Sequence, residues 1–160
     1  MDTKECIERL AEFSSEIRKI TLKRLEEVPE GFINWRLNNT AMSFAHLVKH
    51  IIDVDELFFS LSTTNKRTFK WEMGSEEPHL DVDETIYKSL IKTLKSNGEK
   101  RNVIISEFNA TTINHLVRNE KEEEMTFWWF IMRKVLEHET YHRGQIAAYL
   151  KVLKGESSQL

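Results

Sequence analysis

The sequence has few of the residues that break helices, with five glycines and two prolines among 160 residues. Average usage would give roughly 19 of these residues, so the composition disfavours a turn-rich β protein and favours long helices. The single cysteine, Cys6, excludes an internal disulfide and a cysteine-based zinc site, which fits a reducing compartment. We therefore expect a cytoplasmic protein built mainly of helices.

Long hydrophobic runs and clusters of basic residues are also missing. The longest apolar run, residues 127–132, is far shorter than the ~18 residues that cross a bilayer. The polar N-terminus has no apolar stretch typical of a secretory signal. Because Lys and Arg number 23 against 26 Asp and Glu, without a basic cluster, we expect neither nucleic acid nor membrane as a partner.

Apolar residues recur at helical spacing in four segments of the chain. These segments are residues 3–28, 41–62, 83–108 and 126–153. Asp83 and Thr126 are the expected N-caps of the last two helices. Four amphipathic helices with polar connections predict an all-α fold, a four-helix bundle that forms a single domain over residues 1–160.

The connections contain the remaining helix breakers and polar runs. Residues 63–80 and 109–125 are expected to be loops without regular structure. Residues 96–98, Ser-Asn-Gly, predict a kink or a break in the third helix, and Gly155 is expected beyond the end of the fourth.

Two pairs of histidines occupy i, i+4 positions inside predicted helices. His138 and His142 continue the apolar stripe of the fourth helix, and His50 lies on the apolar stripe of the second. His46, one turn before His50, lies nearer the edge of that stripe. The other two histidines, His79 and His115, fall in predicted loops, where we expect them to be solvated.

Three imidazoles in one core need polar partners. A buried imidazole without a hydrogen bond costs on the order of 1–3 kcal/mol, and a divalent metal would satisfy one nitrogen of each ring. Residues at i and i+4 lie ~6 Å apart on one face, so two imidazoles can share one ion. The sequence therefore predicts His50, His138 and His142 as metal ligands, while a metal-free bundle with hydrogen-bonded histidines is the alternative.

Residues 138–142, His-Glu-Thr-Tyr-His, also match the H-E-x-x-H motif, in which two histidines bind zinc and the glutamate is a general base. The motif makes Glu139 a candidate catalytic base, although it lies ~100° round the helix from His138. No strand is evident to hold an extended peptide, which disfavours a protease. A di-iron site is also disfavoured, because Glu139-x-x-His142 is the one Glu-x-x-His motif on a predicted helix.

Two segments resemble motifs of the DinB-like superfamily of metalloenzymes. Residues 135–146, VLEHETYHRGQI, are similar to its C-terminal helix motif, and residues 43–51, SFAHLVKHI, are similar to its second-helix motif. The resemblance implies an up-down-down-up four-helix bundle that binds nickel, zinc or another divalent ion. By motif position the ligands are His50, His138 and His142, with His46 as the rival for the first place.

The same resemblance implies a function and an assembly. Characterised members include thiol-dependent transferases and isomerases that use bacillithiol, mycothiol or glutathione, and many are homodimers. We therefore expect a metal-dependent enzyme acting on a small molecule, with a low-molecular-weight thiol as a further cofactor. Gln145, one turn beyond His142, is a candidate for orienting a bound water or cofactor. Trp128 and Trp129 are expected in the core and at a dimer interface.

Two alternatives to a thiol-dependent transferase stay open. One is a metal-binding bundle without turnover that serves as a sensor or stress protein. The other is a metal-dependent hydrolase of the H-E-x-x-H type.

Overall fold

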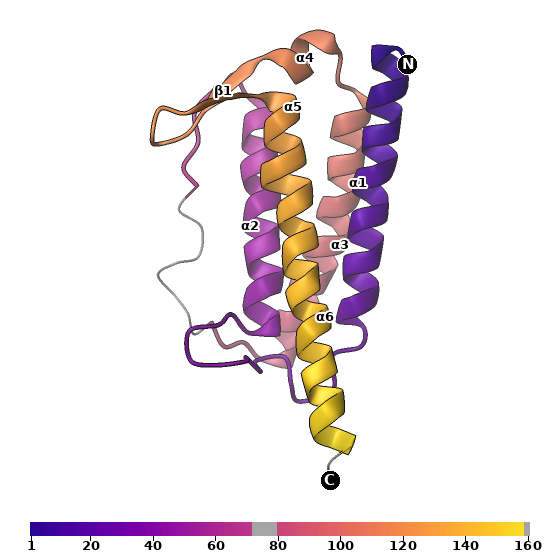
Figure 1. Cartoon of the computed structure of the whole chain (residues 1–160), viewed down its shortest axis with the longest axis vertical. Helices are drawn as coiled ribbons and strands as arrows, with labels where there is room; N and C mark the ends of the chain where they lie inside the picture. Colours follow the sequence, from indigo (N-terminus) through magenta and orange to yellow (C-terminus); the bar gives the residue numbers. More distant parts are fainter. Residues whose placement is uncertain (72–79, 159–160) are drawn as a thin grey trace.

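Four long helical segments form a bundle in the computed structural model, which describes residues 1–71 and 80–158 (Figure 1). The segments are α1 (Thr3–Leu25), α2 (Phe44–Thr63), α3 (Glu84–Ser106), and a fourth made of α5 (Phe127–Phe130), the π-helix η1 (Ile131–Leu136) and α6 (Glu137–Ser158). In Figure 1, α2 and α3 both run opposite to α1, and the fourth segment runs parallel to α1. This confirms the expected up-down-down-up four-helix bundle.

The helices begin where the sequence supplies capping side chains. Asp83 accepts a hydrogen bond from the backbone N–H of Ile86, and Thr126 accepts one from Trp129, so both predicted N-caps are confirmed. Ser43 caps α2 in the same way. Among the described residues, no helix is both long enough and apolar enough to cross a bilayer.

Helix α3 continues through residues 96–98, so the predicted break is wrong. Asn97 and Gly98 are buried, with Glu56 of α2 as a hydrogen-bond partner of Asn97 and Arg18 of α1 next to Gly98. Tertiary packing therefore outweighs the low helix propensity of these two residues. The prediction for Gly155 is also wrong, because α6 runs through it to Ser158.

Residues 109–125 are not irregular, as the sequence had suggested. They contain the short helix α4 (Ala110–Asn114) and the strand β1 (Leu116–Arg118), which pairs antiparallel with β2 (Glu124–Thr126). Thr68 adds an isolated parallel bridge to Arg118. Strands of three residues are too short to show a reliable alternation of apolar and polar side chains. These elements lie over one end of the bundle (Figure 1).

The core is divided into two apolar clusters with a polar layer between them. One cluster contains Phe58, Ile105 and Phe130, and the other contains Leu47, Leu94 and Ile146. On α1, α3 and the fourth helical segment, buried polar residues lie in the sequence between the parts that enter the two clusters. On α2 the buried Asp55 lies three residues after Ile52, the last residue of the second cluster on that helix. Arg18, Asp55, Arg101 and Glu139, discussed below, belong to this layer.

Gly98 is needed because the side chain of Arg18 crosses α3 at this point. A Cβ atom at position 98 would lie 2.5 Å from Cγ of Arg18, whereas a Cβ at position 144 would meet nothing within 4 Å. We predict that Gly98→Ala destabilises the protein by about 1–3 kcal/mol, because the buried Arg18 cannot move aside. Gly144→Ala, the matched control on an exposed helical face, should stabilise it by about 0.5–1 kcal/mol. Urea denaturation measures both values, and equal effects would contradict this account.

Candidate metal centre

The bundle brings together the three histidines that the sequence selected. Nε2 of His138 lies 3.0 Å from Nε2 of His50 and 2.9 Å from Nε2 of His142. One nitrogen from each ring lies within 4.8 Å of the others. Two ligands of a tetrahedral zinc ion, each at about 2.0–2.1 Å from the metal, are about 3.3 Å apart. The three rings can therefore hold one divalent ion after small adjustments.

The environment keeps these rings neutral, as metal binding requires. Burial lowers the pKa of His50 to about 4, and the neighbouring His142 contributes in the same direction. Burial also lowers the pKa of His138 to about 3, with His142 and His50 as further causes. A neutral imidazole keeps a lone pair for a metal at neutral pH.

Two side chains outside the triad hold its rings in place. Oε1 of Gln145 contacts Nδ1 of His142, and because a carbonyl oxygen only accepts, this contact places the proton on Nδ1 and the lone pair on Nε2. The ring of Trp71 packs edge-on against His138 at 5.2 Å between centroids. The structure therefore brings Gln145 next to a predicted ligand, although its role in binding a cofactor stays a prediction.

The other histidines lie elsewhere. His46 is buried in the first turn of α2 and is not part of the three-histidine group. His115 is half-buried, with its ring stacked on Phe127 at 4.8 Å, and burial lowers its pKa. The expectation that His115 is solvated is therefore wrong, because α5 packs against it. His79 lies outside the described residues.

A π-helical segment determines which residues of the fourth helix face the core. In η1 the backbone N–H of Glu137 donates to the carbonyl of Met132, five residues back, which inserts one extra residue into the helix. In an uninterrupted α-helix, His138 would share the face of Ile131. With the π segment, Glu139 takes that place at 1% exposure, and His138 lies at the side of the buried stripe.

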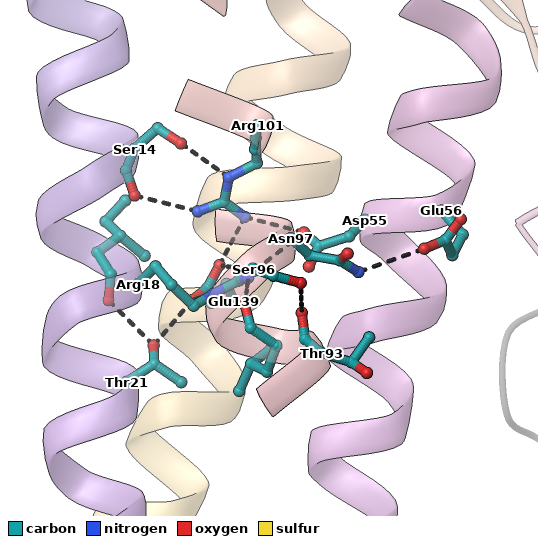
Figure 2. Close-up of polar contacts among 12 residues, drawn as sticks. Ser14, Arg18, Thr21, Asp55, Glu56, Thr93, Ser96, Asn97, Arg101 and Glu139 are labelled. Carbon is teal, nitrogen blue, oxygen red and sulfur yellow. Dashed lines mark hydrogen bonds and ion pairs between the residues drawn. The ribbon is translucent and has the colours of Figure 1, made fainter. Parts of the chain in front are cut away.

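Glu139 lies in a buried ion-pair network that joins all four helices (Figure 2). Nε and Nη2 of Arg18 donate to its two carboxylate oxygens at 2.8 and 3.0 Å. Nη1 of Arg101 donates to Oε2 at 2.8 Å. Asp55 accepts from the same two arginines at 2.9 and 3.2 Å. Two positive and two negative side chains thus balance their charges inside the bundle.

Hydrogen bonds from neutral groups complete the network. Ser14 accepts from Nε of Arg101 at 2.7 Å, the carbonyl of Leu94 accepts from Nη1 of Arg18 at 2.6 Å, and the hydroxyl of Thr21 lies 2.9 Å from Glu139. Burial alone would raise the pKa of Glu139, but Arg101 and Arg18 together lower it to about 2. Burial raises the pKa of Asp55, against the effect of the same arginines.

The sequence reasoning missed three members of this network, Arg18, Asp55 and Arg101. The sequence did contain a signal for them, because each charged residue lies three or four positions from an apolar residue of its own helix and so shares a face with it. Asp55, for example, is four residues after Ile51 and three before Phe58. For Glu139, the geometry favours a structural role. Its oxygens contact arginines and a threonine rather than the three histidines, and a carboxylate with so low a pKa is a weak base.

A cleft of about 470 Å³ opens beside His138. Its walls include Trp71, Trp129 and Tyr141, of which Trp129 is 52% and Tyr141 65% exposed. In the apolar run 127–132 only Trp129 is exposed. Three of the other five side chains belong to the core, and the remaining two, Trp128 and Met132, pack against it. The homodimer implied by the resemblance is not tested by these placements.

Comparisons with known proteins identify a family and a shared fold. The sequence profile of the DinB family matches residues 1–157. A DinB-like protein of Bacillus subtilis, YjoA, has a TM-score of 0.68 at 18% identity, over 91% of this chain and 92% of that chain. YfiT of Bacillus subtilis, described as a probable metal-dependent hydrolase with an unusual four-helix bundle topology, has a TM-score of 0.70 at 13% identity, over 97% of this chain and 91% of that one. No protein with a curated description matches the chain.

The two roles considered for Glu139 predict different results for Glu139→Gln. If the residue is structural, the variant leaves two buried arginines with one carboxylate and loses about 3–5 kcal/mol of stability. The matched control is Glu137→Gln, because Glu137 is 57% exposed and pairs with Arg133 at the surface. That control should change stability by less than about 1 kcal/mol. Chemical denaturation of both variants decides the question: a fully stable Glu139→Gln variant would contradict the structural role.

Proposed function

Because the chain belongs to the DinB family, we propose that it is a metal-dependent enzyme in which His50, His138 and His142 bind one divalent cation, with nickel or zinc as the expected metal. The observation that supports this most directly is the convergence of three imidazole nitrogens within 4.8 Å of one another. His50 and His142 are buried and His138 is half-buried, and a bound ion would satisfy one nitrogen of each ring.

The donor set fits a catalytic ion better than a structural one. Structural zinc sites are closed by four protein ligands, whereas catalytic sites have three and keep a position open. Among the described residues, the cluster contains three histidines and neither a cysteine nor a carboxylate. The cleft beside His138 gives a small molecule access to the site.

The chemistry that a bound cation supplies is Lewis acidity, which lowers the pKa of a coordinated water or thiol. The protein's own residues have supporting roles. Gln145 fixes the tautomer and orientation of His142, and Trp71 limits the rotation of His138. Because neutral imidazoles do not compensate the charge of the cation, the cation would lower the pKa of a coordinated water or thiol more strongly.

Thiol transfer is the reaction that this arrangement favours. Hydrolysis of the H-E-x-x-H type needs a carboxylate to take a proton from water, and both oxygens of Glu139 are held by arginines. A thiol is far more acidic than water, at pKa about 8.5, so it needs less help from a general base. We therefore propose a bacillithiol-type thiol as the nucleophile that attacks an electrophilic small molecule.

Two other functions remain as candidates. Hydrolysis is favoured by the likeness to YfiT, which is described as a probable hydrolase. A metal-binding protein without turnover would use the same three histidines and leave the cleft empty. The proposal also keeps the homodimer and the cytoplasmic location as expectations.

Metal content tests the ligand assignment. Wild-type protein purified without a histidine tag should contain about one divalent ion per chain, and His50→Ala should lose most of it. The matched control is His46→Ala, which removes a buried histidine of the same helix from outside the cluster. Elemental analysis gives the values. Clearly substoichiometric metal in the wild type, even after incubation with nickel or zinc, would contradict the proposal.

A panel of thiols tests the reaction class. We expect conjugation of a reactive electrophile such as 1-chloro-2,4-dinitrobenzene with at least one of bacillithiol, mycothiol and glutathione. The rate should fall by at least about 100-fold in His50→Ala, as expected when a catalytic group is removed. Hydrolysis of ester or amide substrates at a metal-dependent rate, without thiol transfer, would favour the hydrolase. Neither activity would favour the non-catalytic protein.

A further inference from the structure

The cleft beside His138 contains a lysine in an unusual setting. Lys134 is half-buried in the cleft wall, one helical turn before His138. Its Nζ lies 4.9 Å from the ring centroid of Trp71. Among the described residues, no carboxylate lies within ion-pair distance of it, although two glutamates line the same cleft.

Those two glutamates have other partners. Glu137 is paired with Arg133 at 3.1 Å on the exposed rim, so these two charges cancel. Glu123 accepts a hydrogen bond from Nδ2 of Asn119 at 3.0 Å. Among the described residues Lys134 therefore forms no ion pair. It does lie close enough to Glu120, whose carboxylate accepts from the backbone N–H of Trp71 at 3.0 Å, to contribute to the lowered pKa of that residue. A half-buried ammonium that forms no ion pair with the described residues gains when an anion binds in direct contact with it.

Trp71 links this charge to the candidate metal centre. Its ring contacts both the ammonium group of Lys134 and the imidazole of His138, which lies 5.2 Å away between centroids. The two groups are therefore no farther apart than one small molecule can span. Trp129 and Tyr141 add exposed aromatic surface on the same side.

We propose that this cleft binds a small molecule with an aromatic or apolar body and a carboxylate group, and that Lys134 selects it by pairing with the carboxylate. The proposal rests on the proposed function, because it makes Lys134 a specificity-determining residue of the same enzyme. The volume of about 470 Å³ suits a molecule of this size. The aromatic walls bind the body, while Lys134 sets which end faces the metal centre.

Binding of a matched pair of probes tests the proposal without any turnover. 3-Phenylpropionate carries a carboxylate, and 3-phenylpropionamide has almost the same shape without the charge. Quenching of tryptophan fluorescence and ligand-observed NMR measure their binding to the full chain, both zinc-loaded and treated with chelator. We expect the acid to bind about tenfold more tightly than the amide, because one hydrogen bond to a charged group contributes about this much to affinity. This preference should weaken in high salt.

Three variants assign the preference to Lys134. Lys134→Met should abolish it, and Lys134→Arg should keep it, because the charge is retained. Lys151→Met is the matched control, since Lys151 is an exposed lysine on α6 away from the cleft lining; it should keep the full preference. In zinc-loaded protein, any direct contact between acid and metal is common to wild type and variants, so the difference between them reports on Lys134.

Several outcomes would overturn the proposal. They are equal binding of acid and amide to the wild type, an unchanged preference in Lys134→Met, and no binding of either probe at millimolar concentration. The last result, together with a dimer in light scattering, would show that a second copy of the chain covers this face. Metal content measured on the same samples separates the two claims. A preference in zinc-incubated protein that has taken up no metal contradicts the proposed function alone, and bound metal without a preference contradicts the role of Lys134 alone.

Discussion

The buried ion pairs among Arg18, Arg101, Asp55 and Glu139 are the constraint on which the rest of the bundle depends. They bring two positive and two negative side chains into a core where each is 3% exposed or less. Each arginine contacts both carboxylates, so α1, α2, α3 and α6 meet at one level. Removing one partner of a buried pair costs about 3–5 kcal/mol. Alternative arrangements in which one helix slides or rotates would incur this penalty.

This constraint also determines where the candidate metal ligands lie. His50 is five residues before Asp55 on α2, and His138 and His142 flank Glu139 on α6. The two helices that supply the histidines are therefore held by the same pair of arginines. When Asp55 and Glu139 are in place, the register of α2 against α6 is set. Nε2 of His138 then lies 3.0 Å from Nε2 of His50 and 2.9 Å from Nε2 of His142. A structural network thus preorganises the site without lining it.

Periodicity and capping were enough to predict the four helices, the bundle and the three clustered histidines. They could not reveal the π segment at Ile131–Leu136, because a one-residue insertion leaves no mark in composition. An uninterrupted helix puts His138 at the centre of the stripe, whereas the π segment gives that place to Glu139. The break predicted at Gly98 failed for another reason: a distant arginine, Arg18, occupies the space that a side chain there would need. The second error comes from a tertiary contact that local patterns do not contain.

The central claim is that three imidazoles from α2 and α6 hold one divalent ion and leave part of its coordination open. X-ray absorption spectroscopy of untagged, zinc-loaded protein measures the ligand set directly. The account predicts three imidazole nitrogens at about 2.0–2.1 Å and one or two light atoms from solvent, with the imidazole signal reduced in His50→Ala. A spectrum with sulfur or protein carboxylate ligands, or one unchanged by His50→Ala, would contradict it.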